Sequence, residues 1–221
     1  AIWDDIGITI TANDAIAQLD EDFNGQYIQV QAGTIYDMAV FVCNHCGLNF
    51  ALTREETAAL PNGNIIFTLY SENDIKTYRD FMSSLAQLAG GFVYADHNGD
   101  LAIKSYLYEG TTVDTITANE RITGVEFSDY ETYYNGVYYE LDNGREKKTV
   151  GPSTGTAGCI ALGHQPFLQI GQGNTDAVLT TLNQVARSIR VVPFKFSTLS
   201  ATCYELGDYI TAGVQISTGW G

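Results

Sequence analysis

Apolar residues recur at intervals of three and four positions in three segments of the first half of the chain. This spacing places them on one face of an α-helix and predicts amphipathic helices that pack on a core. The apolar positions are Ala15, Ile16, Leu19 and Phe23; then Ile35, Met38, Ala39, Val42, Cys43 and Cys46; then Tyr78, Phe81, Met82, Leu85, Leu88 and Ala89.

Each of these segments opens with the pattern Thr-x-x-Asp. A Thr hydroxyl at the N-cap accepts a hydrogen bond from an amide of the first turn, and the Asp lies at the positive end of the helix dipole. The pattern therefore predicts three helix starts, at Thr11 with Asp14, at Thr34 with Asp37 and at Thr77 with Asp80.

The second and third segments form a short internal repeat. Residues 34–47 and 77–90 have the same length, and each ends at a glycine suited to a left-handed helix cap, Gly47 or Gly90. A strand-like stretch follows each glycine, at 48–52 and at 92–94. The repeated unit is thus predicted to be helix, glycine cap and strand.

Asn-Gly pairs between apolar runs predict tight hairpin turns. The clearest pair lies in the sequence from Asp96 to Gly99, between the strand at 92–94 and a returning strand at 101–106. Asn62-Gly63 and Asn143-Gly144 carry the same signal.

Strand-like runs dominate after about residue 107, and a small-residue loop at 151–158 separates two of them. One helix is predicted at about 174–190, where apolar residues again recur at helical spacing. The predicted strands are 122–127, 133–141, 147–150, 159–162, 191–197 and 209–214.

These elements predict an α+β fold in two domains. Residues 1–106 form an α+β domain with the internal repeat, in which helices pack on a short sheet. Residues 107–221 form an antiparallel, β-barrel-like domain into which the helix at about 174–190 is inserted.

The charge balance argues against nucleic-acid and membrane-surface binding. The chain has 26 acidic and 11 basic residues and a net charge of −15, which repels phosphate backbones and anionic lipids. No apolar run reaches the roughly 18 residues that a membrane span needs, and no signal peptide is recognisable. Since the sequence opens on an apolar segment without an initiator Met, we expect a fragment of a longer protein.

The pair Cys43 and Cys46, with His45 between them, is the sharpest candidate for metal or redox chemistry. Zinc needs two further ligands, but Cys159 and Cys203 are far away in the sequence. The pair also lies in the last turn of its helix, where the negative dipole end disfavours a thiolate. We interpret the cysteines as core residues made in a reducing compartment, with metal binding and redox activity as the alternatives.

Other candidate chemistry is weaker. Asp96, Asn98 and Asp100 begin like a calcium loop, but Leu101 and Leu107 occupy the positions that need Gly and Glu. The segment Gly171-Gln-Gly173 could bind an anion, but it lacks a third Gly and a nearby Lys. The histidines, at 45, 97 and 164, and the acid pairs, Asp20 with Asp22 and Glu55 with Glu56, show no ligand or catalytic spacing.

We therefore expect no catalytic, cofactor-binding or metal-binding residues and no enzymatic activity, because the known nucleophile, metalloprotease and phosphate-loop motifs are also missing. A hydrolase built on paired carboxylates stays an alternative that needs a cleft with two converging acids. Four Tyr fall within residues 133–139. We interpret them as cross-strand packing, and a sugar-binding platform is the alternative.

Four stretches resemble the hub and tail-associated proteins of phages and prophages, a family that includes baseplate hubs and their counterparts in long non-contractile tails. Residues 10–20 place a Thr-Ala pair before a helix, and residues 33–48 form a helix that ends in Cys-x-x-x-Gly. Residues 77–106 combine a helix, Gly-Gly-Phe and an Asp-x-Asn-Gly-x-Leu hairpin, and residues 204–210 carry a Glu-x-Gly-Asp strand.

The resemblance implies a structural component of the virion tail, made in the bacterial cytoplasm, that joins the tail tube to the distal tip. It implies a ring-type homo-oligomer, often a trimer, with tail-tube, distal-tail and fibre or spike proteins as partners and a negative lumen past which DNA slides. The family's usual N-terminal β-domain and C-terminal fibre or hydrolase region are not in this sequence, so the ring is expected of the full-length protein. A carbohydrate-binding or adhesive β-module is the alternative function.

Overall fold

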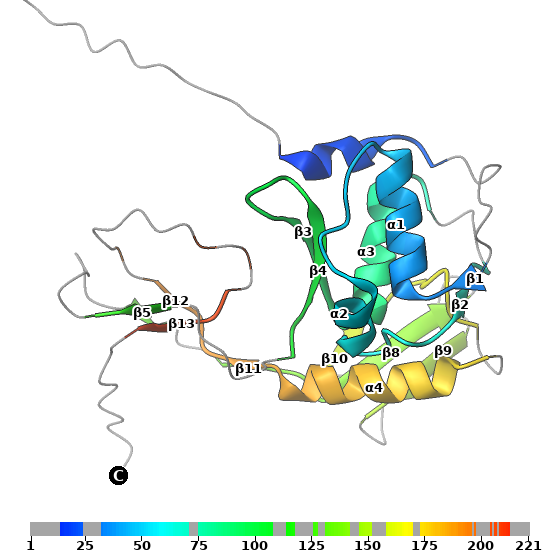
Figure 1. Ribbon diagram of the computed structural model, residues 1–221. Coiled ribbons are helices and arrows are strands. Elements are labelled where there is room, and N and C mark those ends of the chain that lie inside the picture. The colour runs from blue at the N-terminus through cyan, green and yellow to red at the C-terminus, as the bar shows by residue number, and fades with distance from the viewer. Residues whose placement is uncertain are drawn as a thin grey trace, which may run out of the picture.

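The computed structural model describes residues 14–23, 32–70, 75–107, 114–117, 126–127, 131–141, 146–151, 158–169, 173–195, 197, 204, 206 and 208–212. Figure 1 shows a body of helices and short sheets beside a narrower region of two-stranded ladders. We call this narrower region the arm; it comprises the described residues within 114–133 and 190–212.

Helix α1 (Ile35–His45) begins where the sequence predicts it. The Thr34 hydroxyl accepts a hydrogen bond from the Asp37 amide, and the Asp37 carboxylate accepts one from the Thr34 amide. The chain leaves the helix through Gly47, whose φ of 69° lies in the left-handed region. The buried face is the predicted one: Ile35, Met38, Ala39, Val42 and Cys43.

Helix α3 (Tyr78–Leu88) repeats this construction. Thr77 and Asp80 form the same reciprocal cap, and Gly90 turns the chain with a φ of 61°. A Cβ on Gly90 would lie 3.0 Å from the Val185 side chain, so this glycine also permits a close approach of two elements. The buried face is Tyr78, Phe81, Met82, Leu85, Ala86 and Leu88.

The first predicted helix is shorter and starts later than the sequence suggested. It is a 3₁₀-helix, η1 (Ala15–Asp20), and its N-cap is Asp14, whose carboxylate accepts a hydrogen bond from the Ile16 amide. The predicted start at Thr11 is therefore wrong, and Thr11 itself lies outside the described residues. Asp is as strong a capping residue as Thr, and here it stands directly before the apolar positions.

Helix α2 (Arg54–Ala59) was not predicted, although Thr53 and Glu56 form a complete capping box. The helix has only six residues, and the one that it buries is Thr57. Because this helix shows no recurring apolar positions, the periodicity that revealed α1 and α3 could not reveal it.

The predicted hairpin at Asp96 to Gly99 is confirmed. Strands β3 (Gly91–Ala95) and β4 (Leu101–Ser105) pair antiparallel, and Ala95 faces Leu101 across the turn. The residues of 48–52 add only a single parallel bridge, from Phe50 to Leu101, so the full strand predicted there is wrong.

The Asn62-Gly63 pair forms a turn but no hairpin, which corrects the prediction. It lies between α2 and β2 (Phe67–Thr68), and β2 pairs antiparallel with β1 (Ala32–Gly33). Asn62 is buried and donates from Nδ2 to the carbonyl oxygen of Leu88 at 2.9 Å. The pair thus fixes a turn against the end of α3, a tertiary role that the dipeptide alone does not reveal.

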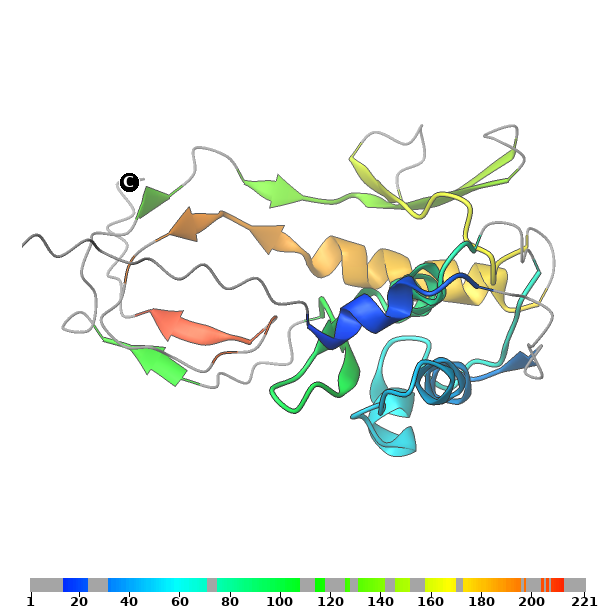
Figure 2. The same ribbon diagram turned by 90° about the horizontal axis from the view of Figure 1, so that it is seen from above.

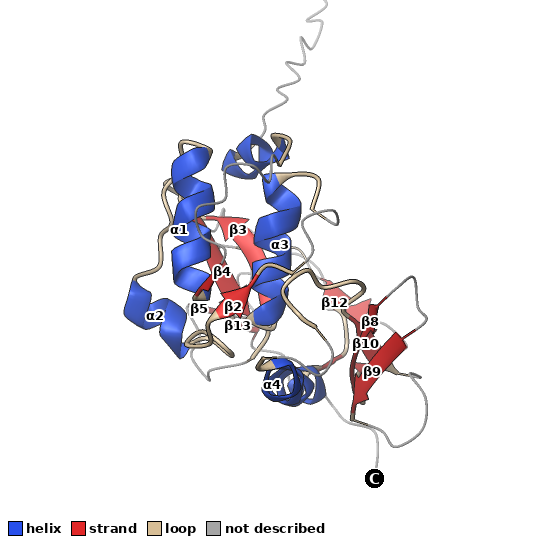
Figure 3. Cartoon of the chain, turned by 90° about the vertical axis from the view of Figure 1, so that its right-hand side faces the viewer, coloured by secondary structure: helices blue, strands red, loops and turns tan. Residues whose placement is uncertain are grey.

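The body also contains a three-stranded sheet that helix α4 covers. Strand β8 (Gly136–Leu141) is central, with β9 (Glu146–Val150) antiparallel and β10 (Cys159–Ala161) parallel to it. The β8–β9 pairing confirms the hairpin predicted at Asn143-Gly144, whose turn lies outside the described residues. Helix α4 (Thr175–Ser188) confirms the predicted fourth helix; it packs against β8 and lies below α3 in Figure 3.

Figure 2 shows the arm extending from the C-terminal end of α4. Its described strands pair two by two, and no described helix lies over them. The pairs are β5 (Asp114–Ile116) parallel to β13 (Ile210–Ala212), β6 (Glu126–Phe127) antiparallel to β12 (Phe194–Lys195) and β7 (Thr132–Tyr133) antiparallel to β11 (Arg190–Val191).

The α+β prediction is consistent with this arrangement, but its barrel-like part is not confirmed. The described strands form separate small sheets rather than a closed ring, and two pairs, β10 with β8 and β13 with β5, are parallel rather than antiparallel. Alternating apolar residues identify strands, but they do not identify the partner with which each strand pairs.

One hydrophobic core spans the predicted boundary between residues 106 and 107. Phe81 on α3 packs against Phe167 at 5.2 Å between ring centroids, and Leu179 on α4 is fully buried in the same cluster. The division at residue 106 stays a prediction, although the two sides share buried contacts.

Candidate interaction surface

The Cys43 and Cys46 thiols lie where the apolar pattern placed them. Cys43 is buried in the core, and Cys46 packs against it. Burial and the neighbouring thiol raise the pKa of Cys43 to about 12, and burial with the Glu21 carboxylate raises the pKa of Cys46 to about 11. Both thiols therefore resist forming the thiolate that metal binding and redox chemistry need.

No metal site is assembled within the described part of the chain. None of its His, Cys, Asp and Glu residues gather in groups of three or more that could hold an ion. Cys159 stands on β10, Cys203 lies outside the described residues, and the expected absence of a metal stays a prediction.

The Asp96 carboxylate serves the hairpin turn. It accepts hydrogen bonds from the amides of Asn98 at 2.8 Å and Asp100 at 2.9 Å. The backbone hydrogen bonds, that of Asp100 foremost, hold the pKa of Asp96 below its ordinary value. The residues that resemble the start of a calcium loop thus form an Asx-type turn.

Two of the candidate acids and one of the histidines also have structural contacts. Asp20 forms an ion pair with Arg79, and Glu56 caps α2. His45 lies 3.5 Å from Glu21 and stacks on Tyr78 at 4.4 Å between ring centroids. Residues 170–172, which include most of the predicted Gly171-Gln-Gly173 loop, lie outside the described residues.

The Tyr-rich segment divides between core and surface. Tyr139 is completely buried, and Tyr134 packs against the core. Tyr133, in contrast, is 60% exposed on β7 of the arm.

The arm buries almost nothing. Ile116 is the one buried residue among its described residues whose burial is known. Five large apolar or aromatic side chains of the arm are exposed: Phe127, Tyr133, Val192, Phe194 and Leu206.

Polar contacts at the surface lie within or beside single ladders of the arm. Arg190 pairs with Glu131, and this hydrogen bond lowers the pKa of Glu131. The Tyr204 hydroxyl donates to Asp114 at 2.7 Å and lowers the pKa of Asp114. Because these groups are exposed to water, such contacts orient strands more than they stabilise them.

Most basic side chains that the structure describes are already paired within the chain, so the surplus acids leave the remaining surface negative. The ion pairs are Arg54–Asp37, Arg79–Asp20, Lys104–Asp208, Lys148–Asp176, Arg190–Glu131 and Lys195–Glu126.

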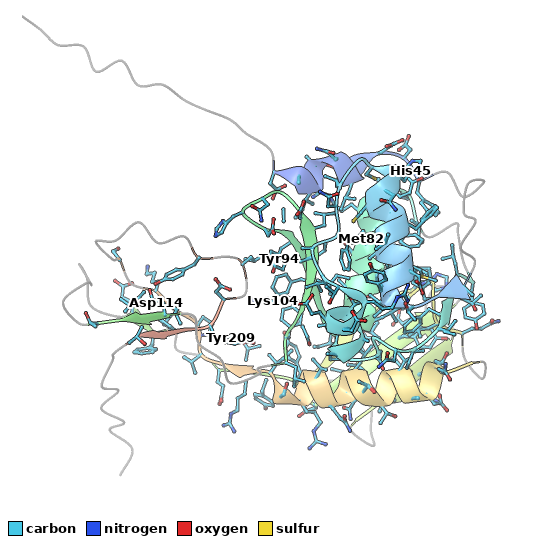
Figure 4. The ribbon with its side chains drawn as sticks, in the orientation of Figure 1. His45, Met82, Tyr94, Lys104, Asp114 and Tyr209 are labelled. Carbon is cyan, nitrogen blue, oxygen red and sulfur yellow. The ribbon has the colours of Figure 1, made fainter. Side chains whose placement is uncertain are left out.

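A groove lies where the arm meets the body, along the outer face of the β3–β4 hairpin. Figure 4 shows Tyr94 and Lys104 on the side of the hairpin toward the arm, which carries Tyr209. Lys104 donates to Asp208 of the arm at 2.9 Å. These residues were not among the candidates predicted from the sequence, although the alternation along the hairpin places Phe92, Tyr94 and Lys104 on one face.

Comparisons with known proteins add a structural likeness. No family model matches the chain, and no curated protein matches it. Among solved structures, it is similar to a 43 kDa tail protein of prophage MuSo2 from Shewanella oneidensis, with a TM-score of 0.48 and 11% sequence identity. The match covers 93% of this chain and 60% of that chain, so this chain spans less than two thirds of that protein. A likeness of this size assigns neither a family nor a function.

None of the described helices combines the length and the apolar character that crossing a lipid bilayer requires.

Proposed function

We propose that the chain is a structural component of a phage or prophage tail, a baseplate-hub or tail-tip scaffold between the tail tube and the distal tip. The four sequence stretches that resemble this family support the proposal. The observation that carries it is the arm, which exposes apolar side chains and strand edges while burying only Ile116 among its described residues of known burial.

Two-stranded ladders are marginally stable in water unless something covers them. Each described ladder of the arm has two strands, so each strand presents an edge that pairs with no other described strand. Exposed edges and aromatic side chains such as Phe127 and Phe194 are typical of surfaces that another chain completes. The arm therefore fits a role in assembly better than a role in catalysis, and we propose that the protein is not an enzyme.

The proposed partners are other tail proteins and further copies of the full-length chain, arranged as a ring such as a trimer. The negative surface suits this setting, because it repels the phosphates of DNA that moves past without binding it. The proposed location is accordingly the tail of the virion.

The test compares assembly of the full-length protein with and without the arm's aromatic pair. We expect light scattering to show a closed oligomer for the natural protein and smaller species for the double variant Phe127→Ser, Phe194→Ser. The matched control is Tyr70→Ser, an exposed aromatic residue of the body. A full-length protein that is monomeric, alone and with its tail partners, would refute the proposal.

A carbohydrate-binding or adhesive β-module is a second candidate, because Tyr133 is exposed on a strand of the Tyr-rich segment. Saturable glycan binding that is lost in Tyr133→Ala would favour this function. Tyr139→Ala is not a useful probe, since this fully buried side chain supports the core.

A further inference from the structure

The groove between hairpin and arm consists of two adjoining hollows. They have volumes of about 490 and 390 Å³ and share Ser105, Asp208 and Tyr209 in their walls. Volumes of about 300–1,000 Å³ are typical of sites for small ligands. The groove is therefore large enough to hold a ligand on either side of the shared residues.

An aromatic row forms one wall of the groove. The ring centroid of Phe92 lies 6.1 Å from that of Tyr94 and 5.3 Å from that of Tyr106. Phe92 and Tyr94 are half-buried, whereas Tyr106 is 50% exposed. The rings come together because Phe92 pairs with Lys104 in the hairpin register, so alternate residues of both strands share the outer face.

The Lys104–Asp208 ion pair lies beside this row. The Lys104 side chain is 29% exposed and the Asp208 side chain 15%, and the ammonium lies 5.9 Å from the centroid of the Tyr94 ring. Removing two charges from water in a largely apolar wall is costly, and their mutual attraction often fails to offset that cost. The pair does, however, place hydrogen-bond donors and acceptors beside stacked rings.

From this combination we infer that the groove binds a short, uncharged saccharide. The apolar faces of sugar rings stack on aromatic side chains, and their hydroxyls both donate and accept hydrogen bonds, as an ammonium and a carboxylate require. The net charge of −15 disfavours an acidic sugar. The site goes beyond the proposed assembly role and lies apart from Tyr133.

A proline-rich peptide is the nearest competitor, because such peptides also bind to aromatic grooves. The prolines of such a peptide offer carbonyl oxygens, which can accept from the Lys104 ammonium, but no N–H donors, so the peptide would cover the Asp208 carboxylate without replacing its lost water contacts. A saccharide replaces those contacts, and this difference decides between the two ligands.

Saturation-transfer NMR on the 221-residue chain tests the inference with maltotriose, cellotriose and N,N′-diacetylchitobiose as probes. We expect saturable binding of at least one probe, and at least a tenfold weaker affinity in Tyr106→Ala and in Asp208→Asn. Asp208→Asn keeps the shape of the side chain, so it tests the site even if Tyr106→Ala does not fold. Tyr70→Ala is the matched control and should bind like the natural protein.

No binding of any of the three probes would overturn the inference, as would affinity unchanged in both groove variants. Loss of binding in Tyr133→Ala with the groove variants unaffected would move the site to the Tyr-rich strand and overturn it too. Saturable binding of poly-L-proline, but of no sugar, would replace it with a peptide groove. The assembly test measures mass and does not depend on any of these results.

Discussion

The body and the arm both contain short strands, but the body buries most of its large apolar side chains, whereas the arm leaves most of its described ones exposed. In the body, the inner face of the β3–β4 hairpin is covered by α3, and α4 covers β8 (Figure 1). In the arm, the rings of Phe127 and Phe194 lie at the surface with their centroids 5.8 Å apart, and no described helix covers them. The body thus completes its own core, whereas the described residues of the arm leave large apolar side chains exposed.

The largest effect should come from truncating the body's core. Leu85 on α3 is fully buried, so Leu85→Ala removes packing and leaves a cavity that should cost roughly 2–5 kcal/mol of unfolding free energy. Leu206→Ala in the arm is the control, because that side chain is 65% exposed. Urea denaturation measures both variants, and similar losses would remove the distinction between body and arm.

Close backbone approach in the body gives the next largest effect. A Cβ on Gly91 would meet the Lys104 carbonyl oxygen at 1.9 Å, so Gly91→Ala must force the β3–β4 strands apart at a cost of about 1–3 kcal/mol. At Gly163 the space is open but φ is 61°, so Gly163→Ala reports strain of the left-handed conformation alone. Equal thermal shifts in the two variants would contradict the crowding at Gly91.

Alkaline pH should weaken the body through Cys43. Its pKa rises from an ordinary 9.0 to about 12 on folding, mainly because of burial. The folded state therefore holds the thiol proton more tightly than the unfolded chain. The resulting stability is complete below pH 9, is about 1 kcal/mol smaller by pH 10 and continues to fall until about pH 12.

The measurement is the unfolding free energy from pH 8 to 10.5 for the natural chain and for Cys43→Ala. The variant starts from a lower value, but its decline with pH should be shallower. Parallel declines in the two proteins would show that other groups, such as tyrosines, cause the loss.

How far the sequence predicts the fold depends on how local each signal is. The caps at Thr34 and Thr77 and the turn at Asn98-Gly99 involve residues four or fewer positions apart, and all three are confirmed. The parallel partnership of β5 with β13 joins residues nearly a hundred positions apart, so no local pattern could reveal it. The barrel-like prediction, which depends on such long-range pairings, is accordingly not confirmed.

The candidate surface likewise combines features that local sequence signals reveal with features that only the folded chain brings together. Hairpin register predicts that Phe92, Tyr94 and Lys104 share a face, so one wall of the groove could be found from the sequence. Asp208 comes from the other end of the chain and meets Lys104 only in the folded protein. The exposure of the arm's aromatic residues could not be predicted from the sequence either, because an apolar residue in a strand is normally expected to be buried.

The smallest effect should come from the arm's surface charges. The Lys195 Nζ atom lies 2.9 Å from Oε2 of Glu126, but the two side chains are 80% and 71% exposed, so water screens their attraction. Lys195→Gln should therefore leave the thermal midpoint of the 221-residue chain within experimental error at physiological salt. The body variant Arg54→Gln provides the comparison, since it removes the partner of Asp37, whose pKa the Arg54 hydrogen bond lowers. If Lys195→Gln lowered the midpoint more than Arg54→Gln, the arm would depend on its own charge pairs, and the proposal that another chain completes it would lose support.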